Sequence, residues 1–333
     1  MLTRNLLDDD PAVAASDDGR HDSAFSTLFL RDMLAALREP VRSISPKYFY
    51  DAEGSALFDR ICDLPEYYPT RTEVSILQAH ADEFAQRMGP QAELIEFGAG
   101  SCTKVRLLLD AMDSPARFLP IDISGAHLEA AAAGLRSDYP GLQVRPVVGD
   151  YTRGLALPAP LRGGGRRVGF FPGSTLGNFA PREALNFLRM AAQLLRGGAL
   201  VLGVDRVKAP NELHAAYNDA QGVTAAFNLN LLARANRELG ADFDVADGFD
   251  HAAFYNAPLQ RIEMHLMSRR RQTVSVGGEP FVFEHGQTLH TENSHKFTTE
   301  GLNALARQAG WRPGPVWSDP AGRFGVHWLD APP

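Results

Sequence analysis

Residues 94–112, Leu-Ile-Glu-Phe-Gly-Ala-Gly-Ser-Cys-Thr-Lys-Val-Arg-Leu-Leu-Leu-Asp-Ala-Met, decide the fold of this protein. Residues 94–97 predict a short buried strand, and the following Gly-Ala-Gly is a turn that only residues without bulk can make. Apolar side chains then recur at helical spacing, at Val105, Leu108, Leu109 and Met112. We expect a helix from Thr103, capped by Ser101 or Thr103. Strand, glycine turn and helix open a nucleotide-binding α/β domain, in which the helix N-terminus offers free N–H groups to the ligand.

The glycine turn does not by itself identify the nucleotide. A dinucleotide fingerprint reads G-x-G-x-x-G, and here Thr103 stands where the third glycine would be. Glu96 lies two residues before Gly98, at the carboxyl end of the strand. An acid there is typical of S-adenosylmethionine sites, where it accepts a hydrogen bond from the amino group of the methionine part. A dinucleotide site and an ordinary tight turn of another α/β enzyme remain open on this stretch alone.

Carboxylates also follow later strands. Four further strands are predicted, at residues 117–121, 143–148, 167–171 and 199–205. Asp122 follows the first of them, where a carboxylate usually grips ribose hydroxyls. Asp150 and Tyr151 follow the second, so that Asp150 can accept from an adenine amine while Tyr151 lies near the ring face. Each acid alone could be a turn residue. Their shared place at the carboxyl ends of strands favours a nucleoside site.

Composition limits the classes of function. The chain has 333 residues, 44% hydrophobic and 22% charged, typical of one large or two small globular domains. A net charge of −7 gives no reason to expect nucleic acid as a partner. No apolar run approaches a membrane span, and the N-terminus is acidic, unlike a signal peptide. Two cysteines, Cys62 and Cys102, fit a reducing cytoplasm, and we interpret Cys102 as a small residue near a ligand.

The region before the glycine turn is aromatic. We expect residues 1–23 to be a mobile tail and 24–39 an amphipathic helix. Four tyrosines then surround a short helix, at Tyr48, Tyr50, Tyr67 and Tyr68. They either pin a loop to the core or form a lid over a small polar ligand. Residues 70–73, Thr-Arg-Thr-Glu, have capping-box spacing and predict a helix that ends at Gly89.

The pattern changes after residue 208. Helices are predicted at 212–219 and 223–239, and strands at 260–267, 273–276 and 281–284. Such a block is an insertion rather than part of a parallel sheet. A helix at 297–310 and a hairpin of 315–318 with 323–329 then return to the first domain. A hairpin that finishes a mostly parallel sheet is the ending of class I methyltransferases.

With all these residues considered together, the chain resembles the histidine Nα-methyltransferases of ergothioneine biosynthesis over about residues 45–330. The motifs that carry the resemblance are Lys47-Tyr-Phe-Tyr-Asp, Leu64-Pro-Glu-Tyr-Tyr-Pro-Thr-Arg-Thr-Glu73, Gly173-Ser-Thr-Leu-Gly-Asn178, Ala216-Tyr-Asn-Asp-Ala-Gln-Gly-Val-Thr-Ala-Ala-Phe-Asn228, Asn236-Arg-Glu-Leu-Gly-Ala-Asp-Phe-Asp244 and Thr291-Glu-Asn-Ser-His-Lys-Phe297. The resemblance implies a Rossmann-like α/β methyltransferase domain, residues 70–208 with 297–333. A second α+β domain, residues 24–69 with 209–296, would bind the substrate.

The resemblance also implies roles for single residues. The cofactor S-adenosylmethionine would contact Glu96, Gly98, Gly100, Lys104, Asp122, Asp150, Tyr151 and Gly173. Tyr67 and Asn178 look like substrate residues near the amino group, with Tyr50 as a polar helper. Tyr217 looks like the carboxylate binder. Glu292 and Ser294 match the pair that addresses the imidazole, with Met264 lining that pocket.

The chemistry of these residue types agrees with such roles. Glu292 and Ser294 are two apart on an extended run and so share one face. A carboxylate can accept the proton of one ring nitrogen while a hydroxyl meets the other. His285, His290, Glu292 and His295 could suggest a metal site, but their spacing fits no single strand or helix register, so we expect no metal.

The first hypothesis is Nα-trimethylation of L-histidine to hercynine by a cytoplasmic, monomeric enzyme. The second is a related methyltransferase acting on another amino acid or small amine. The third is a non-catalytic partner-binding protein on the same fold, against which the intact Glu96, Asp122 and Asp150 argue.

Overall fold

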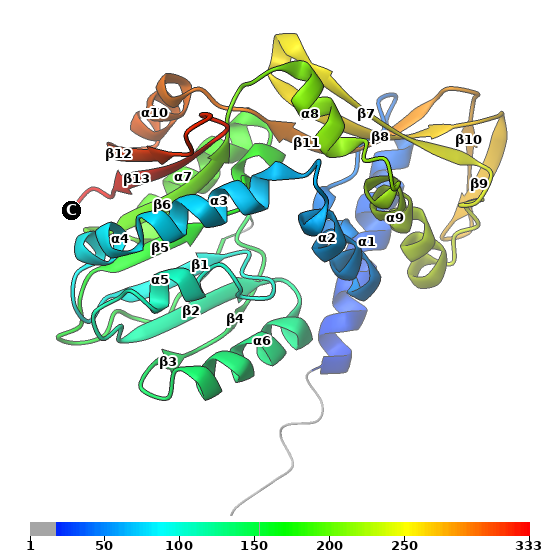
Figure 1. The fold of residues 1–333 in the computed structure, drawn as a ribbon. Helices are drawn as coiled ribbons and strands as arrows, with labels where there is room; N and C mark the ends of the chain where they lie inside the picture. Colours follow the sequence, from blue (N-terminus) through cyan, green and yellow to red (C-terminus); the bar gives the residue numbers. More distant parts are fainter. Residues whose placement is uncertain (1–17, 153) are drawn as a thin grey trace, which may run out of the picture.

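The computed structural model describes residues 18–152 and 154–333, and a central eight-stranded sheet organises the first of its two parts (Figure 1). The strand order is β12-β13-β6-β5-β1-β2-β3, with β4 also paired to β2. Its strands are β1 Glu93–Phe97, β2 Arg117–Asp122, β3 Gln143–Val144, β4 Val147–Val148, β5 Arg167–Phe171, β6 Ala199–Asp205, β12 Arg312–Ser318 and β13 Phe324–Asp330. Strands β1 to β6 pair in parallel, and β13 runs antiparallel between β6 and β12. The mostly parallel sheet with a C-terminal antiparallel hairpin is therefore confirmed.

Helices cover both faces of this sheet. One face packs against α3 Tyr68–Ala79, α4 Ala81–Met88, α5 Arg106–Leu109 and α6 Gly125–Asp138. The other face packs against α7 Pro181–Leu194 and α10 Thr299–Gln308, and the short helix η2 Thr175–Asn178 follows β5. Strand β1 is buried along its whole length, as expected for a parallel strand covered on both faces.

The second part holds a separate hydrophobic cluster, formed by residues from 29–68 and 213–289. Its helices are α1 Asp18–Arg38, η1 Pro46–Phe49, α2 Ala52–Asp63, α8 Pro210–Tyr217, α9 Val223–Leu239 and η3 Ala257–Leu259. A three-stranded antiparallel sheet, β11-β8-β7, consists of β7 Phe249–Asn256, β8 Arg261–Ser268 and β11 Thr288–His295. Strands β9 Gln272–Val276 and β10 Glu279–Phe283 form a hairpin beside it (Figure 1). This separation of clusters supports the expected two domains, whose boundaries stay a prediction.

The chain leaves the second part where β11 ends. Phe297 N–H donates to the carbonyl of Asp205, the last residue of β6, at 2.9 Å, and Val207 N–H donates to the carbonyl of Phe297 at 3.2 Å. The strand that carries the predicted imidazole pair therefore ends directly at the carboxyl edge of the central sheet.

Several local predictions were wrong. Helix α3 begins at Tyr68, and Thr70 donates to the sulfur of Cys62 at 3.2 Å, so residues 70–73 form no capping box. The helix after the glycine turn spans only 106–109, and Ser101 bonds Thr103 instead of capping it.

Other elements differ in extent or were missed. The strand expected at 143–148 is two short strands, β7 was not predicted, and β11 was expected only as an extended run around residues 292–294. Helix α1 begins at Asp18, inside the expected tail, whereas residues 1–17 lie outside the described part of the chain.

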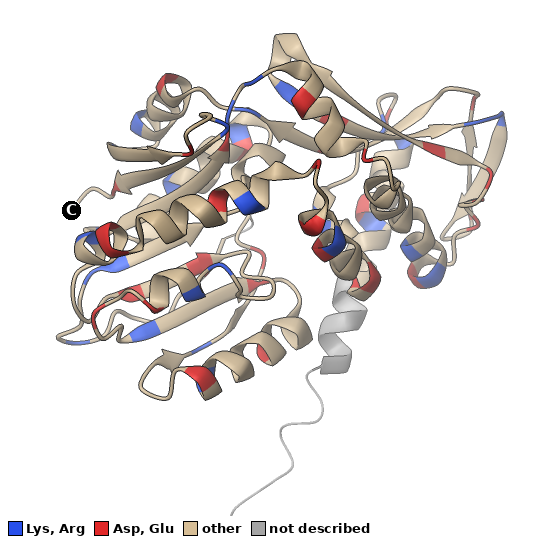
Figure 2. Ribbon diagram, in the orientation of Figure 1, with Lys and Arg blue, Asp and Glu red and all other residues tan. Residues whose placement is uncertain are grey.

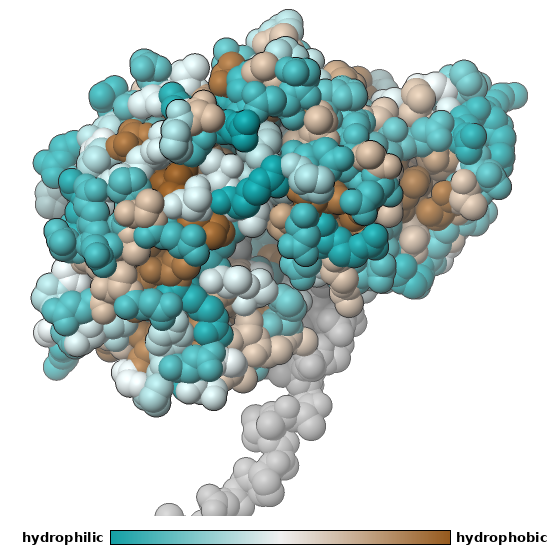
Figure 3. Space-filling view, viewed as in Figure 1, coloured by the Kyte–Doolittle hydropathy of each residue, from teal (hydrophilic) through white to brown (hydrophobic). Residues whose placement is uncertain are grey.

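Charged and hydrophilic residues are spread widely over this view of the molecule (Figures 2 and 3). Within the described residues, no helix is long and apolar enough to cross a membrane. Basic and acidic residues are interspersed over the ribbon (Figure 2), and hydrophilic residues cover most of the face in Figure 3.

Candidate active site

The glycine turn after β1 has the backbone geometry that the sequence indicates. Gly98 and Gly100 have φ of 70° and 50°, a region that favours glycine. The N–H groups of residues 98 and 99 both donate to the carbonyl of Ile121 at 2.9 Å, which ties the turn to β2. A Cβ on Gly98 would lie 3.3 Å from the Tyr151 hydroxyl, so the position has little room for a side chain. Cys102 is buried, and burial raises the pKa of its thiol, which fits an inert small residue.

Two acidic side chains flank this turn. Asp122 accepts from the backbone N–H of Gly100 at 3.1 Å and of Ser124 at 3.0 Å, so it orders the turn. Glu96 is 2% exposed, and its Oε2 atom has no hydrogen-bond partner among the residues that the structure describes. Burial raises the pKa of Glu96 well above the usual range, because an ionised carboxylate is poorly solvated there. A buried carboxylate with an unpartnered oxygen fits a cationic ligand group such as an ammonium.

Asp150 and Tyr151 lie after β4, at the same edge of the sheet. Asp150 accepts from Thr152, through the backbone N–H at 2.9 Å and the hydroxyl at 2.5 Å, and from the Lys47 ammonium at 3.4 Å. The Tyr151 ring packs edge-on in an aromatic cluster of Phe97, Phe171 and Phe187, at centroid distances of 6.1, 5.8 and 5.7 Å. Lys47 belongs to the second part of the chain and so reaches across to the first.

Glu73 joins two other predicted cofactor residues and was missed as a site residue. Its carboxylate accepts from the Lys104 ammonium at 2.6 Å and from the Gly173 N–H at 3.0 and 2.9 Å, and its side chain is 1% exposed. Glu73 had been interpreted as half of a capping box, because its spacing from Thr70 suits one. That Glu73 is buried and faces the carboxyl ends of the strands can be recognised only from the tertiary structure.

Most of the predicted substrate residues surround one small cavity in the second part. Its lining residues are Phe58, Ile61, Tyr67, Ala216, Tyr217, Thr224, Phe227, Met264 and Glu292. The cavity thus brings together four predicted residues: Tyr67 directly before α3, Tyr217 from α8, Met264 from β8 and Glu292 from β11. Burial raises the pKa of Glu292 to about 7 although Lys296 opposes the shift. The carboxylate therefore changes charge near neutral pH.

Tyr50 and Asn178 lie beside this cavity and not among its lining residues. The Tyr50 ring is 36% exposed and packs edge-on against Phe58 and Phe227 at centroid distances of 5.7 and 5.8 Å. Asn178 ends η2, is half-buried, and makes no side-chain hydrogen bond with the described residues. Its neighbour Gly177 lies against His295 of β11, so η2 packs next to the strand that carries Glu292 and Ser294.

A buried polar cluster lies next to the cavity. Ser294 and Tyr217 bond each other at 2.8 Å, and the Lys296 ammonium donates to both, at 2.8 and 3.1 Å. Lys296 also pairs with Asp205 at 2.9 Å, and Asp205 accepts from the Tyr68 hydroxyl at 2.7 Å. Lys296 belongs to the 291–297 motif, but the sequence predicts no role for it. The alternation of 292, 294 and 296 along an extended run is the signal that could have identified it.

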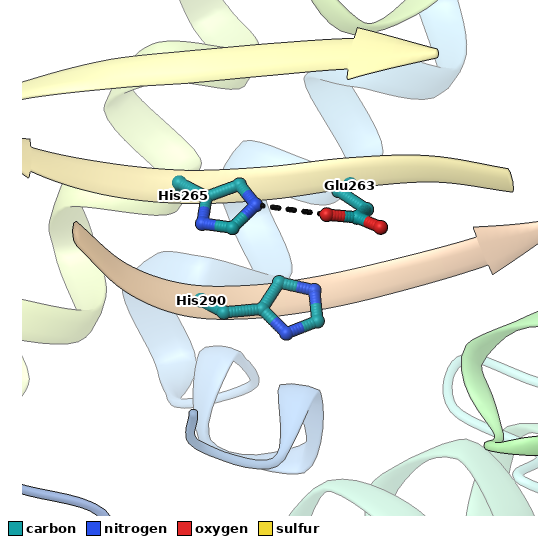
Figure 4. Close-up of side chains that lie close together, drawn as sticks. All are labelled: Glu263, His265 and His290. Atoms are coloured by element: carbon teal, nitrogen blue, oxygen red, sulfur yellow. Dashed lines mark hydrogen bonds and ion pairs between the residues drawn. The ribbon is translucent and has the colours of Figure 1, made fainter. Parts of the chain in front are cut away.

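A second cluster has the composition of a metal site but not the geometry (Figure 4). Ligand atoms of Glu263, His265 and His290 lie within 4.8 Å of one another. The two imidazole rings stack at 4.7 Å, with 28° between their planes, so their in-plane lone pairs do not converge on one point. Arg261 already pairs with Glu263 at 2.7 Å, and Ser43 bonds His290 at 3.2 Å.

This cluster shares only His290 with the set considered from the sequence. Its geometry fits a hydrogen-bonded surface of the three-stranded sheet. The expectation that the protein uses no metal stays a prediction.

A family model described as "Histidine-specific methyltransferase, SAM-dependent" matches residues 29–331. The chain belongs to this family. It is therefore an S-adenosylmethionine-dependent methyltransferase, as the acids around the glycine turn had indicated, and the reading as a non-catalytic protein is set aside.

Named relatives cover nearly the whole chain. The histidine N-alpha-methyltransferase of Mycolicibacterium smegmatis is 44% identical over 311 residues, 92% of this chain and 95% of the relative. The histidine N-alpha-methyltransferase of Mycobacterium tuberculosis is 43% identical, over 89% of this chain and 92% of the relative. Ergothioneine biosynthesis protein 1 of Neurospora crassa is 29% identical over 86% of this chain, which matches 33% of that longer protein.

Proposed function

We propose that this methyltransferase transfers three methyl groups to the α-amino nitrogen of L-histidine and forms hercynine, a step of ergothioneine biosynthesis. One observation carries the proposal: Glu292 lines the same cavity as Tyr67 and Tyr217, and Ser294 is bonded to that Tyr217. A carboxylate and two phenols thus line the cavity, and the Ser294 hydroxyl is bonded to one of these phenols, a set of polar groups suited to a small polar amino acid. Relatives named for histidine methylation at 43–44% identity support the same substrate.

We assign the methyl donor to the edge of the sheet where β1, β2 and β4 end. When bound, S-adenosylmethionine supplies an electrophilic methyl group on a sulfonium sulfur. Glu96 would hold the amino group of the methionine part, because its buried Oε2 atom lacks a partner. Asp122 would accept from the ribose hydroxyls, and Asp150 from the adenine amine. The remaining proposed contacts are Gly98, Gly100, Lys104, Tyr151 and Gly173.

We assign the substrate amino group to Tyr67 and Asn178, with Tyr50 nearby. Methyl transfer needs the neutral amine, because a protonated amine has no lone pair. Burial raises the pKa of Tyr67 well above its usual range, so it acts as a neutral phenol and orients the lone pair without adding charge. Burial also raises the pKa of Tyr217, which would bind the substrate carboxylate. The chain thus contributes mainly orientation and exclusion of water.

We assign the imidazole to Glu292 and Ser294, with Met264 against the ring. A side chain that leaves either polar group unpaired inside the cavity is strongly disfavoured, which would select against other amino acids.

The test is a panel of the amino acids incubated with the purified protein and S-adenosylmethionine, read by mass spectrometry. We expect mono-, di- and trimethylated histidine, and Glu292→Ala should lower kcat/KM for histidine at least ~10-fold. Glu284→Ala is the matched control, because Glu284 is 62% exposed at the end of β10. Turnover of another amino acid without any methylated histidine would overturn the substrate assignment.

We also propose that the enzyme acts as a monomer in the cytoplasm. The free cysteines, Cys62 and Cys102, support the reducing compartment, and the monomer is proposed from the sequence alone. Light scattering coupled to gel filtration should give a mass near 36.3 kDa, and twice that mass would contradict the monomer.

A further inference from the structure

Two buried carboxylates and one ammonium lie near the carboxyl ends of β1 and β5. The carboxylates belong to Glu73 of α3 and Glu96 of β1, and the ammonium belongs to Lys104. Within the described residues, Lys104 donates to Glu73 alone, at 2.6 Å. Its charge reaches Glu96 without a hydrogen bond, and there it opposes the rise in the pKa of that carboxyl. One cation is thus divided unequally between two acids.

The backbone around Glu73 fixes the acid that takes this cation. Both oxygens of Glu73 accept from the N–H of Gly173, at 3.0 and 2.9 Å. Gly203 of β6 leaves the space that the carboxylate fills, because a Cβ there would overlap Glu73 Oε1. The Lys104 side chain is 20% exposed and less constrained than its partner. The position of Glu73 therefore decides where the ammonium of Lys104 lies.

Glu96 is left without a cation of its own. Its Oε2 atom has no hydrogen-bond partner in the described part of the chain. The charged groups that face it there are Lys104, Glu73 and Asp122. Two of these are acids, and the third is bonded to Glu73. Cys102, in the same turn, stays an uncharged thiol because burial raises its pKa. Burial beside two acids favours the neutral form of Glu96.

We propose that Glu73 is a positioning residue that holds Lys104 away from Glu96, so that Glu96 stays available to the ammonium group of the methyl donor. Without the Glu73 carboxylate, Lys104 would face a buried acid that lacks a cation and would pair with it. The protein's own ammonium would then occupy the place of the ligand's. This inference rests on the proposed assignment of the donor and adds how the free protein keeps that place open.

The arrangement links binding of the donor to a proton. With Lys104 held by Glu73, Glu96 carries a proton in the free protein and must lose it to pair with an ammonium. The proton passes to the buffer, and the ammonium keeps its three hydrogens. S-adenosylhomocysteine has the same amino group and should therefore release a proton on binding at about pH 6.5, where such amino groups are protonated.

The test is calorimetry of S-adenosylhomocysteine binding to the full chain in two buffers of different ionisation enthalpy, which together give the number of protons exchanged. We expect release in the wild type and none in Glu96→Gln. In Glu73→Gln, Lys104 should pair with Glu96 and keep it ionised, so the release should be lost and Kd should rise ~10-fold. Loss of packing alone would not remove the proton.

Glu93→Gln is the matched control. Glu93 is a buried acid at the start of β1, paired with Arg117 at 2.5 Å and Arg167 at 3.3 Å, far along the strand from the glycine turn. Its replacement also breaks a buried ion pair, but proton release should persist and Kd should stay within ~2-fold of the wild type.

Binding of S-adenosylhomocysteine to the wild type without proton release overturns the proposal, and this measurement does not depend on the folding of any variant. Release that persists in Glu96→Gln, or in folded Glu73→Gln with an unchanged Kd, overturns it as well. In each of these cases methylation of histidine would leave the proposed function in place. A wild-type chain that neither binds S-adenosylhomocysteine nor methylates histidine would instead overturn the proposed function.

Discussion

Replacing Glu73 by glutamine should destabilise the protein and loosen the edge of the sheet where we assign the cofactor. The Glu73 side chain is 1% exposed, and both of its oxygens accept from Gly173 while one also pairs with Lys104 at 2.6 Å. Glu73→Gln keeps the shape but turns one oxygen into an NH₂ group. That group must then face either the Lys104 ammonium or the Gly173 N–H, and both are donors.

The magnitude follows from the burial of the two partners. Removing one member of a fully buried ion pair costs about 3–5 kcal/mol, because the other charge is left unpaired. The Lys104 side chain is 20% exposed and can turn its ammonium towards water, which reduces the penalty. We therefore expect the free energy of unfolding to fall by about 2–3 kcal/mol.

Chemical denaturation of wild type and variant measures this difference, with the m-value as a check that the same surface unfolds. Glu129→Gln is the control, because Glu129 forms an ion pair at 2.5 Å with Arg136 but is 60% exposed. It should change stability by less than about 0.5 kcal/mol. If Glu73→Gln matches this control, with an unchanged m-value, the reasoning from burial is refuted.

Three further predictions concern the second part of the chain and the place where η2 packs against its strand β11. Burial raises the pKa of Glu292 from 4.5 to about 7, so between pH 4.5 and pH 7 the folded protein binds more protons at this carboxyl than the unfolded protein does. The free energy of unfolding should therefore fall by about 1–3 kcal/mol as pH rises from 4.5 to 7, and Glu292→Gln should flatten this slope in denaturation series. Gly177→Ala would put a Cβ 2.7 Å from the carbonyl oxygen of His295 and should cost about 1–3 kcal/mol in thermal melts, whereas Gly141→Ala, with no atom within 4 Å, should be near neutral. Asn228→Leu should cost about 2–4 kcal/mol by denaturation, because the fully buried amide bonds three groups on neighbouring strands. A loss as small as that of Gly141→Ala in either variant would contradict these packing arguments.

The sequence by itself determined the elements whose signals are local. The apolar run of β1, the Gly-Ala-Gly turn, and the acids at the end of β2 and after β4 are each recognised from a few neighbouring residues, so they are read directly from the chain. Helix α9, predicted at 223–239 with Gly240 as its stop, has those bounds, and Gly240 has φ 60°. The long motifs identified the resemblance to the family, which no single local pattern could have indicated.

Only the tertiary structure decided which polar groups meet. Glu73 satisfied the spacing of a capping box, yet its partners Lys104 and Gly173 come from distant segments, and a buried carboxylate is stabilised more by a cation and an N–H than by a helix end. The bounds of strand β11 escaped prediction because its sequence is mostly polar and shows no clear apolar alternation, although residues 292–294 were expected to be extended. Lys296 bonds Ser294 and pairs with Asp205, and these residues meet only where β11 ends at the central sheet. Hydrogen-bond satisfaction in a buried site is a three-dimensional constraint that spacing along the chain does not encode.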